Sequence, residues 1–299
     1  MRASINAVAC RQLYMAIRLN VQKTPVKFTR KGYAVVVNRL KPEQPRRLVI
    51  TGASGGLGLA LAQHYLEQGA VVGAIARRVD LMQTLSEKFP QQVYCYALDV
   101  RDAADMRAAA QDFIARVGVP DVVIANAGVS IGTLTEYAED IDLFQQVMDI
   151  NVLGVVKTFQ PFLSAMREVG HGSLVGIASV AGFRGLPGAS AYSASKAALI
   201  SYLESLRVEL HGSGVRVMTI CPGYIKTPMT DINPYPMPFI LPADVAALRI
   251  ACAIACGNSH IVIPWQMGLV GCMLKLLPNR LYDFLFNKAP HKPRLSNVG

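Results

Sequence analysis

The chain has 299 residues, of which 52% are hydrophobic and 17% are charged. This composition provides enough apolar material for a large core and excludes an intrinsically disordered protein. No uncharged apolar run reaches the ~18 residues expected of a membrane-spanning helix, so we expect no spanning segment.

The formal net charge of +10 is concentrated at the two ends of the chain. Residues 1–47 carry 11 basic and one acidic side chain, residues 48–244 carry 13 and 18, and residues 245–299 carry six and one. The basic composition therefore does not indicate a nucleic-acid-binding face on the middle of the chain. Basic ends around a mildly acidic middle fit an anionic membrane surface better.

Residues 1–46 form a basic extension that precedes the predicted domain. Its arginine-rich, acid-poor composition is typical of a mitochondrial targeting peptide, but Ser4 is its only serine. We favour an ordinary basic extension, or a start assigned too early with Met15 as the later candidate. The chain shows no secretory signal, which favours a cytoplasmic protein with reduced thiols.

From residue 47 onward, short apolar runs alternate with helical patterns. The apolar runs, interpreted as buried strands, are 48–50, 71–76, 93–98, 122–125, 174–178, 215–220 and 261–263. Helical patterns lie near 58–68, 80–89, 102–117, 136–169, 191–211 and 243–256. Such alternation predicts an α/β fold with a doubly wound parallel sheet covered on both faces. We expect one domain over 47–264 and an apolar C-terminal tail over 265–299.

A glycine-rich segment, TGASGGLG at residues 51–58, joins the first predicted strand to the first predicted helix. Glycines let the backbone turn tightly and approach a pyrophosphate, whose charge then faces the helix N-terminus. A glycine-rich run alone is a weak indication. Its position after the first strand of an alternating pattern indicates a dinucleotide-binding (Rossmann) fold.

The end of the second predicted strand bears on the choice of cofactor. A site selective for NAD usually has an acidic residue there, which binds the ribose 2′-hydroxyl. This chain has Arg77 and Arg78 instead, and an arginine suits the 2′-phosphate of NADP. The alternative is that both are surface arginines paired with Asp80. We favour NADP(H) over NAD(H).

A tyrosine, a lysine and a serine form the predicted catalytic group. Tyr192 and Lys196 are i and i+4 on a predicted helix and share one of its faces. A lysine ammonium beside a tyrosine favours the phenolate, so we expect it to lower the tyrosine pKa. Such a tyrosine can donate a proton to a carbonyl or accept one from an alcohol. Ser179 ends a predicted strand at the ligand-binding edge of the sheet.

Together these features resemble the short-chain dehydrogenase/reductase family, in its compact single-domain branch. The resemblance covers residues 47–264. It depends on these segments: TGASGGLG (51–58), Asp99-Val100, Asn126-Ala127-Gly128, INVLG (150–154), Ser179, YSASK (192–196) and PGYIKT (222–227). The spacing of its glycines differs from that of the extended, epimerase-like branch.

The resemblance implies roles for individual residues. Tyr192 would be the acid/base, and Lys196 would bind the nicotinamide ribose. Ser179 would polarise the carbonyl, and Asn151 would hold a water in a proton relay. Asp99 would contact adenine. The implied cofactor site comprises Gly52, Ser54, Gly56, Leu57, Gly58, Arg77, Arg78, Asp99, Val100, Asn126, Ala127, Gly128, Tyr192, Lys196, Pro222, Gly223, Ile225 and Thr227, with no metal. The resemblance also implies a homodimer or tetramer.

Two positions depart from the family pattern. Ala125 stands where the family often has a second asparagine, which leaves the catalytic residues intact. Gly55 occupies a loop position where NADP-preferring relatives often carry a base, which weakens the argument from Arg77.

The segment after Thr227 is expected to cover the substrate. Its four prolines between residues 234 and 242 predict a short, stiff cover rather than a long helical lid. The candidate lining residues are mostly apolar and include no arginine cluster: Phe183, Leu186, Tyr224, Met229, Tyr235, Met237 and Phe239. An apolar carbonyl or alcohol substrate is therefore expected.

The tail is expected to contain an apolar helix over 267–286, followed by a basic stretch over 288–294. Such a segment can lie in a membrane interface, contact a partner subunit or cover the protein's own body.

The leading hypothesis is thus an NADP(H)-dependent oxidoreductase that interconverts a carbonyl and an alcohol on a small, apolar molecule. A 3-oxoacyl-thioester reductase is an alternative, but it requires a basic patch, for which only Arg184 and Lys226 are available. A non-catalytic NADP-binding regulatory protein is a further alternative, which the presence of both Tyr192 and Lys196 disfavours.

Overall fold

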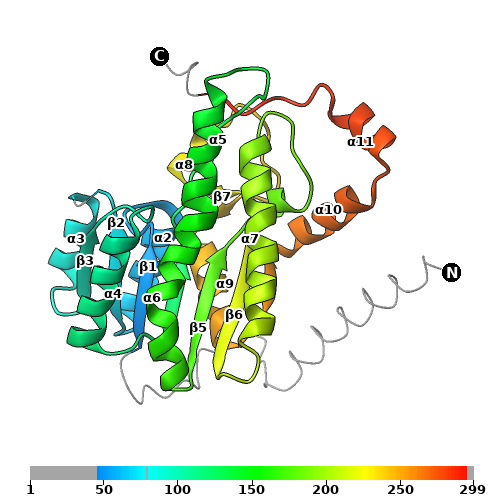
Figure 1. Cartoon of the computed structure of the whole chain (residues 1–299). Helices are drawn as coiled ribbons and strands as arrows, with labels where there is room; N and C mark the ends of the chain where they lie inside the picture. Colours follow the sequence, from blue (N-terminus) through cyan, green and yellow to red (C-terminus); the bar gives the residue numbers. More distant parts are fainter. Residues whose placement is uncertain (1–45, 79, 295–299) are drawn as a thin grey trace, which may run out of the picture. The chain divides into compact units, whose positions relative to one another are not determined.

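Seven parallel strands form the central sheet of the computed structural model, which describes residues 46–78 and 80–294 (Figure 1). The strand order is β3-β2-β1-β4-β5-β6-β9. The bounds are β1 Arg47–Thr51, β2 Val71–Ala76, β3 Val93–Ala97, β4 Val122–Ala125, β5 Gly172–Ile177, β6 Val215–Pro222 and β9 His260–Ile263. The predicted doubly wound parallel sheet is confirmed. The interpretation of the basic extension falls largely outside the described residues and stays a prediction.

Helices cover both faces of this sheet. One apolar core lies between the sheet and α2 (Gly56–Glu67), α3 (Asp80–Lys88) and α9 (Ala243–Ala255). The other lies between the sheet and α4 (Ala103–Val117), α6 (Gly154–Glu168) and α7 (Ser190–Glu209). Burial on both faces explains why the strands are continuous apolar runs rather than alternating ones.

The chain direction across the sheet reverses beside β1, which pairs with β2 on one side and with β4 on the other. Ligands of open α/β sheets bind at the carboxyl ends of the strands beside such a reversal. The fold therefore brings the segments that follow β1, β2 and β4 to one crevice.

The predicted helix over 136–169 is divided in the structure. Residues 136–139 form turns, α5 spans Asp140–Met148, and a π-helical segment, Asp149–Leu153, leads into α6. The π-helical segment places Asn151 in the interior with no exposed surface. Single π-turns of this kind are frequent at functional sites.

The predicted apolar helix over 267–286 is two helices, α10 (Trp265–Leu276) and α11 (Asn279–Phe286). The break lies at Leu277, whose ψ of 130° is extended. It precedes Pro278, and a residue before proline is driven out of the helical region by the proline ring. The segment that is expected to cover the site contains one short helix, α8 (Pro228–Asp231). It is flanked in sequence by two two-residue strands that pair with each other, β7 (Ile225–Lys226) and β8 (Leu241–Pro242).

Candidate active site

The glycine-rich loop between β1 and α2 borders a cavity of about 520 Å³, a volume typical of small-molecule sites. Gly52 has a φ of +69°, and a Cβ there would lie 2.8 Å from Asn126 Nδ2. A Cβ on Gly58 would lie 2.2 Å from the Gly52 carbonyl oxygen. Glycine at both positions therefore lets the loop fold flat against the strand ends and leaves its backbone open to the cavity.

The loop is held to the end of β4 by hydrogen bonds around Thr51. The backbone N–H groups of Asn126 and Ala127 both donate to Thr51 Oγ1 at 3.1 Å, and Asn126 Nδ2 donates to the Thr51 carbonyl at 3.0 Å. Asn126 thus braces the floor of the cavity. Thr51 was not among the predicted site residues, although its place as the first residue of the glycine-rich motif, at the end of β1, was available as an indication.

Two arginines follow β2 at one end of the cavity. Arg77 and Arg78 both line it, and the Arg77 side chain is 61% exposed. Arg77 lies 3.9 Å from the Asp99 carboxylate, which also accepts hydrogen bonds from the Arg101 guanidinium at 2.9 and 3.1 Å. These contacts, those of Arg101 first, hold the pKa of Asp99 below its usual range. The carboxylate paired with Arg77 is thus Asp99, not Asp80 as the alternative interpretation supposed.

The hydroxyl-bearing and cationic side chains meet at the other end of the cavity. Ser179 follows β5, and Tyr192 and Lys196 lie one turn apart on α7; all three line the cavity. Lys196 Nζ donates to the Ile177 carbonyl at 2.7 Å, and it lies 5.8 Å from the centre of the Tyr192 ring. The predicted catalytic group is therefore assembled in space.

Burial governs the proton affinities of this group. It lowers the pKa of Lys196 to about 8 and raises the pKa of Tyr192, because each charged form loses its hydration. A hydrogen bond with the Ser179 hydroxyl opposes the rise at Tyr192. Lys196 Nζ is directed at the Ile177 carbonyl, and Ser179 supplies the contact that opposes the rise. The expected lowering of the tyrosine pKa by Lys196 stays a prediction.

Asn151 lies behind the cavity rather than on its wall. Its Nδ2 donates to the Val129 carbonyl at 2.9 Å and to Ser195 Oγ at 3.0 Å, while its Oδ1 accepts from Val129 N–H at 2.8 Å. Ser195 Oγ in turn donates to the Tyr192 carbonyl at 2.8 Å. The side chain of Asn151 therefore ties the loop after β4 to the helix that carries Tyr192. Ser195 was quoted in the motif without a role.

The predicted site residues converge on this one cavity, with two exceptions. Gly58 and Asn151 support its wall from behind, as described above. Lining residues that sequence analysis had not assigned to the site are mostly backbone or apolar groups: Gly55, Ile75, Ala76, Leu98, Val129, Ile150, Ile177, Ala178, Pro228 and Thr230.

The predicted substrate-lining residues divide in the structure. Met229 lines the cavity. The rings of Tyr224 and Tyr235 lie 6.5 Å apart, and burial, Tyr224 and Tyr192 together raise the pKa of Tyr235 to about 12. Phe183 instead stacks on His260 and faces Gly271 of α10. Phe183 therefore anchors α10.

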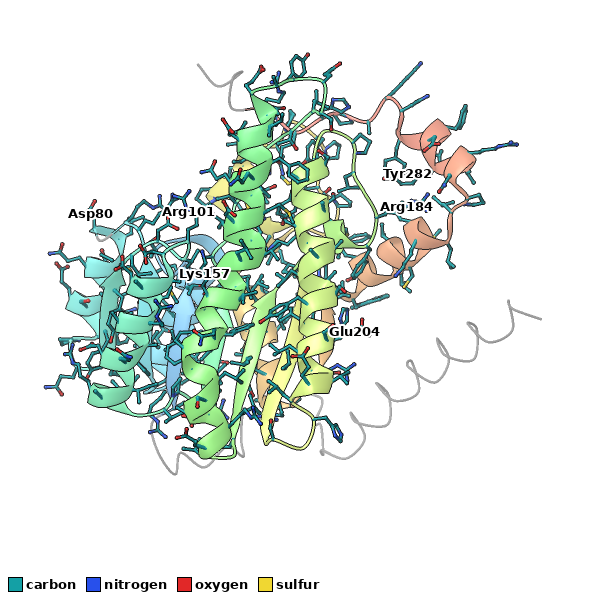
Figure 2. All side chains as sticks on the ribbon, in the orientation of Figure 1. Asp80, Arg101, Lys157, Arg184, Glu204 and Tyr282 are labelled. Atoms are coloured by element: carbon teal, nitrogen blue, oxygen red, sulfur yellow. The ribbon has the colours of Figure 1, made fainter. Side chains whose placement is uncertain are left out.

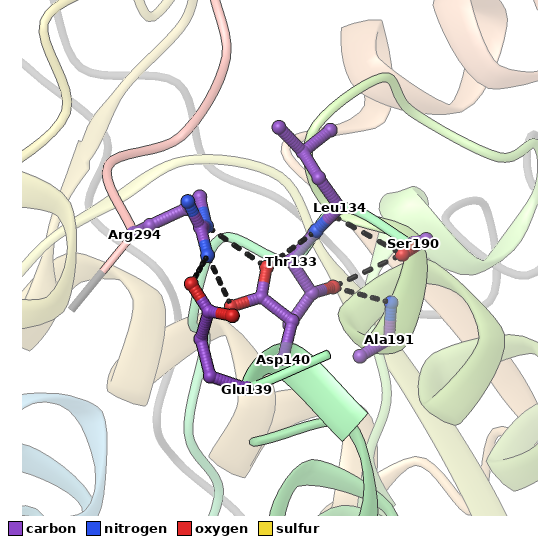
Figure 3. Close-up of polar contacts among 7 residues, drawn as sticks. All are labelled: Thr133, Leu134, Glu139, Asp140, Ser190, Ala191 and Arg294. Carbon is purple, nitrogen blue, oxygen red and sulfur yellow. Dashed lines mark hydrogen bonds and ion pairs between the residues drawn. The ribbon is translucent and has the colours of Figure 1, made fainter. Parts of the chain in front are cut away.

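The end of the described chain returns to the start of α7. Arg294 contacts both oxygens of Asp140 at 2.9 Å, and Asp140 accepts a hydrogen bond from Leu134 N–H at 2.7 Å (Figure 3). The neighbouring Thr133 Oγ1 lies 3.0 Å from Ser190 Oγ. This chain of contacts runs from residue 294 to the first residue of the helix that carries Tyr192.

Comparisons with protein families, with known proteins and with solved structures show what this chain is similar to. The family described as short chain dehydrogenase matches residues 46–234. An uncharacterized oxidoreductase of Myxococcus xanthus is 41% identical over 243 residues, which cover 80% of this chain and 95% of the relative. A 2-dehydro-3-deoxy-L-rhamnonate dehydrogenase (NAD(+)) of Sphingomonas sp. is 36% identical over 189 residues, 63% of this chain and 76% of the relative. The crystal structure of a short-chain dehydrogenase from Streptomyces avermitilis superimposes with a TM-score of 0.70 at 27% identity, covering 82% of this chain and 97% of its own.

Proposed function

The chain belongs to the short-chain dehydrogenase/reductase family of carbonyl/alcohol oxidoreductases, and we propose that it acts on an apolar substrate with NADP(H) as cofactor and Tyr192 as acid/base. The observation that carries the proposal is the convergence of Tyr192, Ser179 and Lys196 at one end of the cavity bordered by the glycine-rich loop. A phenol and a hydroxyl placed together can bind and protonate one carbonyl oxygen.

The residues of the cavity fit a nicotinamide dinucleotide. The glycine-rich loop leaves its backbone open where a pyrophosphate would bind, and a side chain at Gly52 or Gly58 would collide with its neighbours. Such a cofactor, when bound, supplies or accepts the hydride. Gly52, Ser54, Gly56 and Leu57 would hold its phosphates. Asp99, Asn126, Lys196 and Thr227 would hold its rings and riboses.

Proton transfer is assigned to this chain's own side chains. Tyr192 would donate its phenolic proton to the substrate carbonyl oxygen in reduction and recover it from the alcohol in oxidation. Ser179 would donate a hydrogen bond to the same oxygen and orient it. The Lys196 ammonium, whose pKa burial lowers to about 8, would offset the negative charge of the phenolate once the proton has left.

The preference for NADP(H) is inferred from Arg77 and Arg78. Both guanidinium groups border the cavity where β2 ends, and they can pair with a 2′-phosphate. The exposure of Arg77 leaves it free to turn from Asp99 toward such a group. The relative from Sphingomonas is named for NAD(+), so the family alone does not decide the preference.

The apolar substrate is inferred from Met229, which lines the cavity, and from the Tyr224–Tyr235 pair, of which Tyr235 lies near Tyr192. A 3-oxoacyl-thioester reductase would need free bases at this mouth to bind an anionic carrier. The Arg184 guanidinium is already engaged in hydrogen bonds, because it donates to the carbonyls of Leu274 and Leu277 at 2.8 and 2.7 Å. Lys226 remains exposed. A single base disfavours the carrier-bound substrate.

The test uses the full-length protein and a panel of apolar aldehydes and ketones, with NADPH consumption as the readout. Tyr192→Phe should lower turnover by at least ~100-fold while nucleotide fluorescence reports unchanged NADPH binding. Tyr202→Phe, ten residues further along α7, is the matched control and should retain activity. Retained activity in Tyr192→Phe would refute the assignment of the acid. Binding without turnover in the wild type would instead favour the regulatory protein.

A further inference from the structure

An apolar stripe runs along the outer side of α10. Trp265, Leu269, Met273 and Leu276 follow one another at intervals of four, four and three residues, which places them on one face of the helix. They are 66%, 58%, 69% and 72% exposed. Four large apolar side chains on one exposed face are unusual for a free protein surface.

The next helix continues this surface. Leu281, Phe284 and Leu285 of α11 are exposed, Phe284 by 75%. They follow at intervals of three and one residues and so gather on one side of the helix. Tyr282 is buried, with its hydroxyl donating to the Gly185 carbonyl. We call the seven exposed side chains of the two helices the apolar face; they are Trp265, Leu269, Met273, Leu276, Leu281, Phe284 and Leu285.

Contacts on the opposite side fix the orientation of both helices. Besides its bonds to Leu274 and Leu277 at the end of α10, the Arg184 guanidinium lies over the Tyr282 ring at 4.2 Å (Figure 2). Gly271 of α10 lies directly against Phe183. The two helices cannot turn their apolar residues inward without breaking these contacts. The contacted loop is the one that follows Ser179, so both helices are anchored to a segment that leads away from the candidate active site.

The charges around the apolar face select the partner. Lys275, Arg280 and Lys288 are exposed, and Asp283 is the single acidic residue between residues 265 and 290. A symmetric pair of copies would bring this basic patch against a second copy of itself, because an isologous interface repeats one patch on both sides. Anionic lipid headgroups complement them instead, and tryptophan, leucine and phenylalanine are suited to the boundary between headgroups and acyl chains.

We propose that α10 and α11 form a surface that binds an anionic lipid bilayer from one side, with the apolar face inserted among the acyl chains and the three bases at the headgroups. In the described part of the chain, no helix is both long and apolar enough to cross a bilayer. The proposal does not depend on the enzyme's substrate or cofactor.

The chain contains its own reporter, because Trp265 is its only tryptophan. Full-length protein is titrated with vesicles of phosphatidylcholine containing phosphatidylglycerol. Trp265 emission should shift to shorter wavelength, and acyl-chain-brominated lipids should quench it. Binding through the basic extension alone would leave the emission of Trp265 unchanged, and that result would overturn the proposal.

Variants separate the contribution of the apolar face to vesicle binding from that of the basic residues. Leu269→Asp and Phe284→Asp should each weaken vesicle binding by at least about tenfold, and the double variant Lys275→Glu/Arg280→Glu should do so for anionic vesicles. Val208→Asp, an equally exposed apolar residue at the end of α7, is the matched control and should bind normally. Far-ultraviolet circular dichroism checks that each variant is folded. Equal binding by all variants would refute the proposal. So would a concentration-dependent dimer that Leu269→Asp dissociates, because a second copy would then cover the face.

Discussion

Arg294 and Asp140 lie 154 residues apart in sequence and form a two-pronged ion pair with both contacts at 2.9 Å (Figure 3). Asp140 is 3% exposed and begins α5. The Arg294 guanidinium, together with the N–H of Leu134, holds the pKa of this carboxyl below its usual range. The pair therefore fastens the segment after α11 to the loop that supports the start of α7.

Removing either partner should loosen this connection. We expect Arg294→Met and Asp140→Asn each to lower the thermal unfolding midpoint, because the first leaves the buried Asp140 carboxylate without its cation and the second leaves Arg294 only its ion pair with the exposed Glu139. Turnover should also fall, since Thr133 links the loop to the helix that carries Tyr192. The double variant should be no less stable than Asp140→Asn alone. Arg116→Met, which breaks an exposed i,i+4 pair with Asp112, is the control. Additive effects of the two single substitutions would show that the residues act independently.

The glycine-rich loop should tolerate no side chain at residue 58. In Gly58→Ala, the new Cβ meets the Gly52 carbonyl oxygen and Asn126 Nδ2, at 2.2 and 2.5 Å. The loop must move away from the strand ends, so NADPH binding should weaken by roughly tenfold or more. Gly185→Ala, where a Cβ meets open space, should bind normally. Fluorescence titration measures both, and unchanged affinity in Gly58→Ala would remove the loop from the site.

Sequence reasoning recovered what local patterns determine. The centre of β1, Leu48 to Ile50, is a short buried apolar run, and the loop glycines follow closely, so pattern and position agree. Tyr192 and Lys196 were found because a helix places residues i and i+4 on one face. The sequence did not indicate that Asn151 supports the cavity from behind instead of lining it, because Asn151 turns inward through the π-helical segment.

Contacts between distant residues were not predictable in the same way. Arg184 was interpreted as a base at the mouth of the site, yet its partners lie about 90 residues further along, at Leu274, Leu277 and Asn279. Lys292 and Arg294 were assigned to a basic stretch that could face a membrane, a partner subunit or the protein's own body. In the structure both pack on the body, since Lys292 is 8% exposed and Arg294 pairs with Asp140. Sequence composition shows that a side chain is charged, but it does not show which distant residue will pair with it in the folded protein.

The choice of cofactor should depend on Arg77. Arg77→Asp removes a guanidinium from the end of β2 and adds a carboxylate that repels a 2′-phosphate, so NADPH affinity should fall by about tenfold to 100-fold. NADH affinity should change little. Arg107→Asp, an exposed position on α4, controls for the change in net charge. An equal loss for NADPH and NADH would show that Arg77 does not contact the 2′-phosphate.

Lys292 should make stability depend on pH in the alkaline range. Its Nζ donates to Ser130 Oγ at 2.7 Å, and within residues 46–78 and 80–294 no carboxylate lies within ion-pair distance of it. Burial lowers its pKa from 10.5 to about 8. Between these two values the unfolded chain binds more protons than the native protein, so the free energy of unfolding rises with pH through this window and is constant below it.

Lys292→Met removes that dependence. The wild type should gain on the order of 2 kcal/mol relative to the variant as the pH rises from about 8 to about 10.5, while loss of the Ser130 hydrogen bond contributes a difference that does not change with pH. Urea unfolding of both proteins at intervals of pH measures the difference. Lys275→Met, at an exposed lysine of α10, is the matched control. Parallel stability curves for wild type and Lys292→Met would show that the buried ammonium keeps its proton throughout.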